Sequence, residues 1–278
     1  MKNNRNERRT GRAEKAYRNS AFLNSPEARS IRVLCEFEEP ESRFRRMGVQ
    51  DTIVFFGSAR ALPMDAAQER LKKAQSGAAG NATAEAREAV EDAERVVRLA
   101  RYYEAAAALA ERLTKWSKSL PHPSRRFIVC SGGGPGIMEA SNRGASKAEG
   151  LSIGLNISLP VEQEPNPYQT RELSFEFHYF FIRKFWLLYL AKALVFFPGG
   201  FGTMDELFET LTLMQTRRST KPTPIVVFGT EYWKQTVNLN TMVDWGVIKR
   251  KDLDLFRFFD DVDGAFEYLR DELTKHYV

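Results

Sequence analysis

The chain has 278 residues, of which 43% are hydrophobic and 28% are charged, as is usual for a soluble globular protein. No apolar run approaches the roughly 18 residues of a membrane span, so we expect no membrane partner. The net charge of +5 lies in residues 1–46, which hold 12 basic and 7 acidic side chains, whereas the remaining 232 residues hold 29 of each. This polar arm has neither alternating basic and aromatic residues nor a known binding motif, so we also expect no nucleic-acid partner.

The positions of the cysteines and histidines predict no zinc site. Cys35 and Cys130 lie far apart in the sequence, and we interpret both as buried free thiols of a reducing cytoplasm. None of the three histidines lies at metal-ligand spacing from another histidine or a cysteine, so no metal is expected. His178 and His276 fit a structural or surface role better than a catalytic one. The first residues lack the apolar segment of a secretion signal, which also favours a cytoplasmic protein.

The arm, residues 1–46, is predicted to contain a short helix. Residues 1–24 are too polar to bury much surface, so we expect them to be mobile or to lie on a partner. The helix begins at Ser25, because serine is a good N-cap and the proline that follows suits a first turn. Three apolar residues would share one side of this helix, and Pro40 is expected to end it.

The first strand of the body is predicted at 52–56, an apolar run that leads directly into Gly57 and Ser58. Open α/β sheets bind ligands beyond the carboxyl ends of their strands. The backbone of Gly57 and the hydroxyl of Ser58 are therefore candidate binding groups, and Arg60 can reach an anion.

Residues 64–118 are predicted to form a helical insertion. Apolar residues recur at helical spacing, and a Gly- and Asn-containing break lies at 76–81. The pattern predicts a short helix, a turn and a long helix of about 35 residues. This is longer than a usual crossover, so we expect part of it to project, in the direction of a partner subunit.

A second strand at 127–130 opens into a glycine-rich loop that includes Gly133 and Gly134, and Pro135 then favours a helix start. The dinucleotide fingerprint does not fit, because its third glycine would fall on Ile137 or Glu139. No Gly-Lys-Ser/Thr follows, which argues against ATP hydrolysis. Taken alone, this loop could be a tight turn without a ligand.

A third strand is predicted at 151–157, a loop over the sheet edge at 160–170 and an alternating segment at 174–180. The helix that follows, 182–190, is apolar on almost all sides, so we expect one side to meet the sheet and the other a second subunit. Arg183 and Lys184 begin this helix, although cations usually gather at the opposite end. They are either solvated or held there for an anion or for a carboxylate.

The stretch 193–206 is the centre of the predicted site. A buried strand ends at Phe197, and three glycines in four positions, Gly199, Gly200 and Gly202, lead into an amphipathic helix. Glycine amides and the free N–H groups of the first helical turn together form an anion cradle. Thr203 adds a hydroxyl, and Glu206 places a carboxylate beside the bound group.

The same residues have a simpler interpretation. Thr203 and Glu206 are spaced as in a capping box, in which both side chains only satisfy backbone amides. We favour a functional site, because a cap does not need three glycines.

The remaining elements complete the predicted fold. A strand is expected at 223–229, a helix at 233–245, a short extended piece at 255–259 and a closing helix at 262–275. We therefore predict an α/β fold with three Rossmann-like layers, in which an open, mostly parallel sheet of six to seven strands has helices on both faces. Residues 47–278 would form this single domain, with its helical insertion at 64–118.

With these motifs assembled, the chain resembles the Lonely Guy (LOG) family, long labelled "possible lysine decarboxylase", over about 50–245. The motifs occur in the same order along the chain as in the family, and the sequence around them is similar to that of the longer bacterial branch. Glu139 departs from the glycine of plant-type members, and the insertion is long. Three matches carry the resemblance: Gly132-Gly133-Gly134-Pro135-Gly136-Ile137-Met138, Arg183-Lys184 and Pro198-Gly199-Gly200-Phe201-Gly202-Thr203-Met204-Asp205-Glu206.

The resemblance implies a phosphoribohydrolase, which splits AMP or an N6-modified AMP (a cytokinin riboside 5′-monophosphate) into free base and ribose 5-phosphate without a cofactor. It implies that Arg183 and Glu206 are the catalytic pair. The resemblance also implies that a homodimer or larger assembly completes the site near the subunit interface. The substrate-binding groups would be Gly57, Ser58, Gly133, Gly134, Lys184, Gly199, Gly200, Gly202 and Thr203.

Two other functions stay open. The protein could bind AMP-like ligands without turning them over, as a nucleotide sensor. The old decarboxylase label would need a lysine that carries pyridoxal phosphate, for which Lys184 and Lys192 are available, although neither has a context that would lower its pKa.

Overall fold

In the computed structural model, which describes residues 13–80, 83–121, 126–160, 164–218 and 221–278, seven strands form one sheet in the order β4-β3-β2-β1-β5-β6-β7. All neighbouring strands pair in parallel. The chain builds outward from β1 to β4 and then returns to the other side of β1, so the carboxyl ends of β1 and β5 flank the point where the strand order reverses. The strands are β1 (Thr52–Phe56), β2 (Ile128–Ser131), β3 (Ser152–Ile157), β4 (Ser174–Phe177), β5 (Ala191–Phe196), β6 (Ile225–Phe228) and β7 (Arg257–Phe259).

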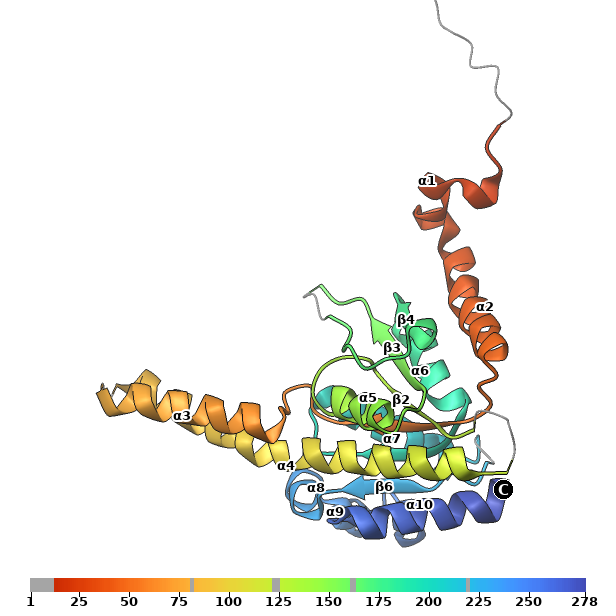
Figure 1. Cartoon of the computed structure of the whole chain (residues 1–278). Coiled ribbons are helices and arrows are strands. Elements are labelled where there is room, and N and C mark those ends of the chain that lie inside the picture. The colour runs from red at the N-terminus through yellow and green to blue at the C-terminus, as the bar shows by residue number, and fades with distance from the viewer. Residues whose placement is uncertain (1–12, 81–82, 122–125, 161–163, 219–220) are drawn as a thin grey trace, which may run out of the picture.

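Helices cover both faces of the sheet (Figure 1). Successive residues of a strand point to opposite faces, so Val54 of β1 joins one core with α2, α6 and α7, and Ile53 joins another with α4, α5 and α10. The predicted three-layer fold is thereby confirmed. No helix of the described part is long and apolar enough to cross a membrane. The helices are α1 (Ser20–Leu23), α2 (Arg29–Met47), α3 (Met64–Gly80), α4 (Ala84–Ser119), α5 (Ile137–Lys147), α6 (Phe180–Tyr189), α7 (Phe201–Gln215), α8 (Thr230–Thr236), α9 (Leu239–Asp244) and α10 (Val262–Tyr277).

The insertion forms a helical hairpin that projects from the body (Figure 1). Helix α4 has 36 residues, as the sequence predicts. Small residues let α3 and α4 pack closely, with Ala67 and Ala100 completely buried between them. The turn lies later than expected, because α3 continues to Gly80; residues 81 and 82 of the predicted break lie outside the described residues.

The expectation that Pro40 ends its helix is wrong. Helix α2 continues to Met47 and stops at Gly48, whose φ of +68° suits a glycine C-cap. A proline inside a helix leaves the carbonyl four residues earlier without its usual donor. Here the indole nitrogen of Trp186 donates to that Glu36 carbonyl at 3.0 Å, so a tertiary contact replaces the missing bond.

Further parts of the sequence interpretation need correction. Cys130 is buried as expected, but Cys35 is exposed on α2. The helix expected at 233–245 is two short helices, because Val237 is extended and Asn238 caps the second one. Residues 1–12 of the predicted mobile segment lie outside the described residues, and 13–24 include the short helix α1.

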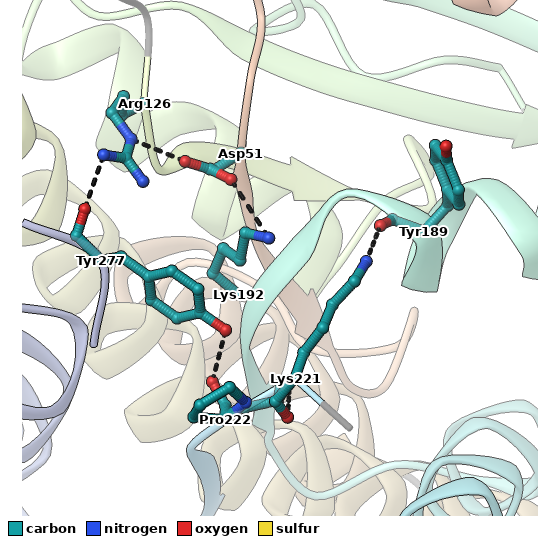
Figure 2. Close-up of polar contacts among 8 residues, drawn as sticks. Asp51, Arg126, Tyr189, Lys192, Lys221, Pro222 and Tyr277 are labelled. Atoms are coloured by element: carbon teal, nitrogen blue, oxygen red, sulfur yellow. Dashed lines mark hydrogen bonds and ion pairs between the residues drawn. The ribbon is translucent and has the colours of Figure 1, made fainter. Parts of the chain in front are cut away.

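The amino ends of the central strands meet in a cluster of charges around Asp51 (Figure 2). The buried Asp51 carboxylate accepts from Arg126 Nε at 2.7 Å and lies 3.5 Å from Lys192 Nζ. Arg126 also donates to the carbonyl of Tyr277, at the C-terminal end of α10. A cation is favourable at such a helix end. This cluster therefore ties α10 to the amino ends of the central strands, opposite the predicted site.

Candidate functional site

A cavity of about 360 Å³ lies at the carboxyl ends of the strands, a volume in the usual range for small-molecule sites. It brings together most of the residues singled out from the sequence. Those on its wall are Gly57, Ser58, Arg60, Gly134, Arg183, Gly200, Gly202, Thr203 and Glu206. Met138 and Asp205 of the quoted motifs are also on the wall, as are residues that the sequence did not single out, among them Asn156, Leu159, Phe180 and Leu187.

Ser58 connects the loops that follow β1, β2 and β5 at the cavity through its backbone. Its N–H donates to the carbonyl of Pro198 at 2.9 Å, and its carbonyl accepts from the N–H of Ile137 at 3.0 Å. The loop after β1 is therefore hydrogen bonded to both glycine loops. The two glycine loops therefore lie side by side at one crevice.

The N-terminus of α7, where the sequence predicts an anion cradle, opens into the cavity. Gly200 is its N-cap, and no side chain caps the helix, so the first N–H groups stay available. A Cβ on Gly200 or Gly202 would meet nothing within 4 Å. Gly199 serves a different purpose, because a Cβ there would lie 2.1 Å from Thr203 Oγ1; the glycine makes room for the threonine, and Tyr232 donates to its carbonyl.

The capping-box interpretation is wrong. Because α7 begins at Phe201, Thr203 and Glu206 are its third and sixth residues, too far along to cap it. Their side chains lie on the cavity wall instead.

Glu206 is the most unusual group of the site. The residue is only 7% exposed, and its Oε2 has no hydrogen-bond partner among the described residues. Burial raises the pKa of its carboxyl to about 7, although the charges of Lys184 and Arg183 oppose this rise. A carboxyl with this pKa is near half ionisation at neutral pH, which suits a proton-transfer group.

Arg183 lies on the wall but does not pair with Glu206 as a bidentate partner. Its Nε donates to the Leu155 carbonyl at 2.7 Å, and no ion pair with Glu206 is formed within the described structure. A Cβ on Gly132 would lie 2.3 Å from Arg183 Nη2, so that glycine provides space for the guanidinium. Burial lowers the pKa of Arg183, and the charge of Glu206 counters this effect.

Three of the predicted binding residues are not on the cavity wall. Lys184 turns to the side of α7, where its Nζ pairs with Asp205 at 2.7 Å and Glu209 at 2.8 Å. Gly133 adopts a φ of +77° and packs against the side chain of Asn156. Gly199 lies behind Thr203, as described above.

Sequence reasoning missed a network of amide side chains that fixes the first glycine loop. Asn166 donates to the carbonyls of Gly133 and Gly134 at 2.9 and 3.1 Å, and Gln169 donates to Gly133 at 2.6 Å. Asn142, buried inside α5, accepts from Asn166 at 3.0 Å. The signal in the sequence is the presence of Asn and Gln residues in the segment 160–170, for which the sequence pattern predicts only a loop over the sheet edge.

Glu139 turns away from the cavity. The hydroxyl of Tyr103, on α4, donates to its carboxylate at 2.8 Å. The long insertion therefore supplies the partner for the residue that departs from the plant-type motif. Burial and this hydrogen bond both raise the pKa of Tyr103.

Comparison with known proteins supports the resemblance noted in the sequence. Residues 138–269 match the family described as "possible lysine decarboxylase", which confirms the resemblance to this family. No curated protein matches the chain.

Several solved structures are similar. The X-ray structure of the protein TM1055 is 19% identical, with 80% of this chain and 99% of that chain covered and a TM-score of 0.48. The molybdenum cofactor binding protein of Rippkaea orientalis is 16% identical, with 80% and 95% covered and a TM-score of 0.45. The molybdenum cofactor carrier protein of Chlamydomonas reinhardtii is 17% identical, with 81% and 99% covered and a TM-score of 0.43.

Proposed function

We propose that this chain, with its confirmed resemblance to the LOG or possible lysine decarboxylase family, is a phosphoribohydrolase of nucleoside 5′-monophosphates. Its substrate would be AMP or an N6-modified AMP, and its products the free base and ribose 5-phosphate. One observation carries the proposal: the buried carboxyl of Glu206, without a hydrogen-bond partner among the described residues, lies on the wall of a cavity that also contains an uncapped helix N-terminus.

The 5′-phosphate would bind at the N-terminus of α7. The backbone of Gly200 and Gly202 and the hydroxyl of Thr203 are on the wall there, and Ser58 and Arg60 face them from the loop after β1. Backbone N–H groups and the helix dipole favour a phosphate at this position. Glu206, one turn farther along the helix, would then lie beside the sugar.

The reaction breaks the bond between C1′ and the base nitrogen. The bonding electrons leave with the base, which takes up a proton, and a water oxygen bonds to C1′ and loses a proton. Positive charge builds on the sugar as the bond breaks, and a fixed carboxylate stabilises this charge more in the transition state than in the substrate. Ionised Glu206 would provide that charge and accept the proton of the water.

Arg183 would act on the substrate rather than on Glu206. Its Nε donates to the Leu155 carbonyl and its Nη2 donates to the Gly132 carbonyl at 3.5 Å, so the N–H groups of Nη1 stay available on the cavity wall. Arginine donates several hydrogen bonds in a fixed plane, which suits a phosphate or ribose oxygen.

A second copy of the chain would complete the site. The outer face of α6 exposes four aromatic residues, and one of them, Phe180, is 53% exposed and also lines the cavity. Contiguous exposed apolar surface marks an interaction site. A dimer that covers this face would therefore adjoin the mouth of the cavity. The four residues are Phe180, Phe181, Phe185 and Tyr189.

The decarboxylase alternative finds little support. Burial works against the charge of Lys184, but its hydrogen bonds to Asp205 and Glu209 outweigh burial and raise its pKa, which is unfavourable for a Schiff-base lysine. Lys192 pairs with Asp51 at the amino ends of the central strands, opposite the cavity.

The test is a panel of nucleoside 5′-monophosphates incubated with the wild type and with Glu206→Ala. We expect release of adenine or of the N6-modified base together with ribose 5-phosphate, measured by chromatography, and loss of that release in the variant. Tight AMP binding with no base release above the Glu206→Ala background would favour the sensor instead.

A further inference from the structure

Three carboxylates gather on the second and third turns of α7, beside the proposed phosphate cradle. Asp205 and Glu206 both line the cavity, and Glu209 lies one turn beyond Asp205. Negative charges so close to an anion site repel the ligand and raise the proton affinity of one another. A site that binds a phosphate beside them therefore needs a compensating cation.

Lys184 is placed to compensate them. It extends from the second turn of α6, and its Nζ lies 2.7 Å from Asp205 Oδ2 and 2.8 Å from Glu209 Oε2. The two carboxylates are four residues apart on one side of α7, so a single lysine holds both. The lysine side chain is 19% exposed, whereas the side chains of Asp205 and Glu209 are 58% and 35% exposed, so solvent partly screens both pairs.

We infer that Lys184 is a positioning residue that acts through Asp205 and Glu209: it fixes the second and third turns of α7 against α6 and neutralises the carboxylates that flank Glu206 and the phosphate cradle. This replaces the direct contact with substrate suggested by the family resemblance. The expected change in kcat/KM rests on the proposed function. The expected changes in the titration of Glu206 and in phosphate binding do not.

The charges that surround Glu206 support this role. The positive charge of Lys184 opposes the rise in the pKa of Glu206, whereas Asp205 and Glu209 add to it. Removal of Lys184 therefore removes one cation and leaves two carboxylates uncompensated. Both changes favour protonated Glu206 and disfavour a bound phosphate.

The test uses Lys184→Gln, Lys184→Arg, Asp205→Asn and the double variant Lys184→Gln/Asp205→Asn. Lys147→Gln is the matched control, because Lys147 pairs with Glu111 on α4, away from the cavity. The carboxyl carbon of Glu206 is titrated by ¹³C NMR, and the affinity for inorganic phosphate is measured by calorimetry. Neither readout requires turnover, so a failure of the proposed function leaves this test intact.

We expect Lys184→Gln to move the titration of Glu206 about one pH unit upward and to weaken phosphate binding about tenfold. Lys184→Arg should preserve both properties, and Asp205→Asn should restore most of the phosphate affinity in the double variant. If AMP is hydrolysed, the acid limb of the kcat/KM profile should move upward by the same amount. An unchanged Glu206 titration in Lys184→Gln, or a double variant that binds phosphate no better than the single one, would overturn the inference.

Discussion

The indole N–H of Trp186 donates to the carbonyl of Glu36 at 3.0 Å, the carbonyl that Pro40 leaves without a helical donor. This bond connects α6, which carries Arg183 and Lys184, to the N-terminal helix α2. We expect Trp186→Phe to lower the free energy of unfolding by about 1–3 kcal/mol, because the carbonyl loses its partner. Urea unfolding measures this change.

A second substitution isolates the hydrogen bond. Pro40→Ala restores a backbone N–H to α2, so the cost of Trp186→Phe should fall in the Pro40→Ala background. Trp245→Phe, at an exposed tryptophan, serves as the control. Equal costs in both backgrounds would show that the bond contributes nothing.

Gly199→Ala should abolish tight AMP binding in a folded protein. The added Cβ would lie 2.1 Å from Thr203 Oγ1, so the threonine must leave its place in the cradle. We expect at least a tenfold loss of affinity by calorimetry, with a near-UV spectrum like that of the wild type. Gly77→Ala, in a position with free space on α3, should bind AMP normally. Retained affinity in Gly199→Ala would place the phosphate elsewhere.

Glu206→Gln should remove activity but stabilise the protein at high pH. The folded-state pKa of Glu206, about 7, lies above that of an unfolded chain, so wild-type stability is complete below the unfolded value and falls as the pH rises through 7. The variant should be about 3 kcal/mol more stable at pH 8 and little changed at pH 4. Urea unfolding at the two pH values checks this, and Glu272→Gln on α10 is the control. Equal differences at pH 4 and pH 8 would contradict a buried, titrating Glu206.

Asp51→Asn should destabilise the fold without touching the cavity. The change leaves Arg126 and Lys192 beside a neutral, buried side chain (Figure 2), at a cost of about 3–5 kcal/mol. Asp271→Asn, which breaks an exposed ion pair, should cost less than about 1 kcal/mol. Thermal or urea unfolding compares the two. Similar small costs would mean that the cluster does not clamp α10.

Phe181→Asp should convert an oligomer into monomers. Phe181 is 54% exposed on the outer face of α6, and a charge there opposes burial against a second copy. Light scattering after size exclusion gives the mass, with Val247→Asp as an exposed control outside α6. A monomeric wild type would rule out the proposed assembly.

The sequence by itself was sufficient to locate the central strands, because buried parallel strands are short apolar runs, and the three runs that lead into glycine loops mark β1, β2 and β5 within one or two residues. It also located the glycine loops and Glu206, since phosphate cradles require small residues at a helix start. It could not assign Pro40, because the partner that lets a proline stay inside α2 comes from residue 186.

Only the tertiary structure decided the role of each charged group. Whether Lys184 meets a ligand or two carboxylates, and whether Glu206 caps a helix or faces a cavity, depends on how α6 packs beside α7 and where α7 begins. The periodicity of the sequence predicts only on which face of its own helix or strand a side chain lies. The proton affinity of a carboxyl, by contrast, is set by the water excluded and the charges placed around it by residues far away in the chain.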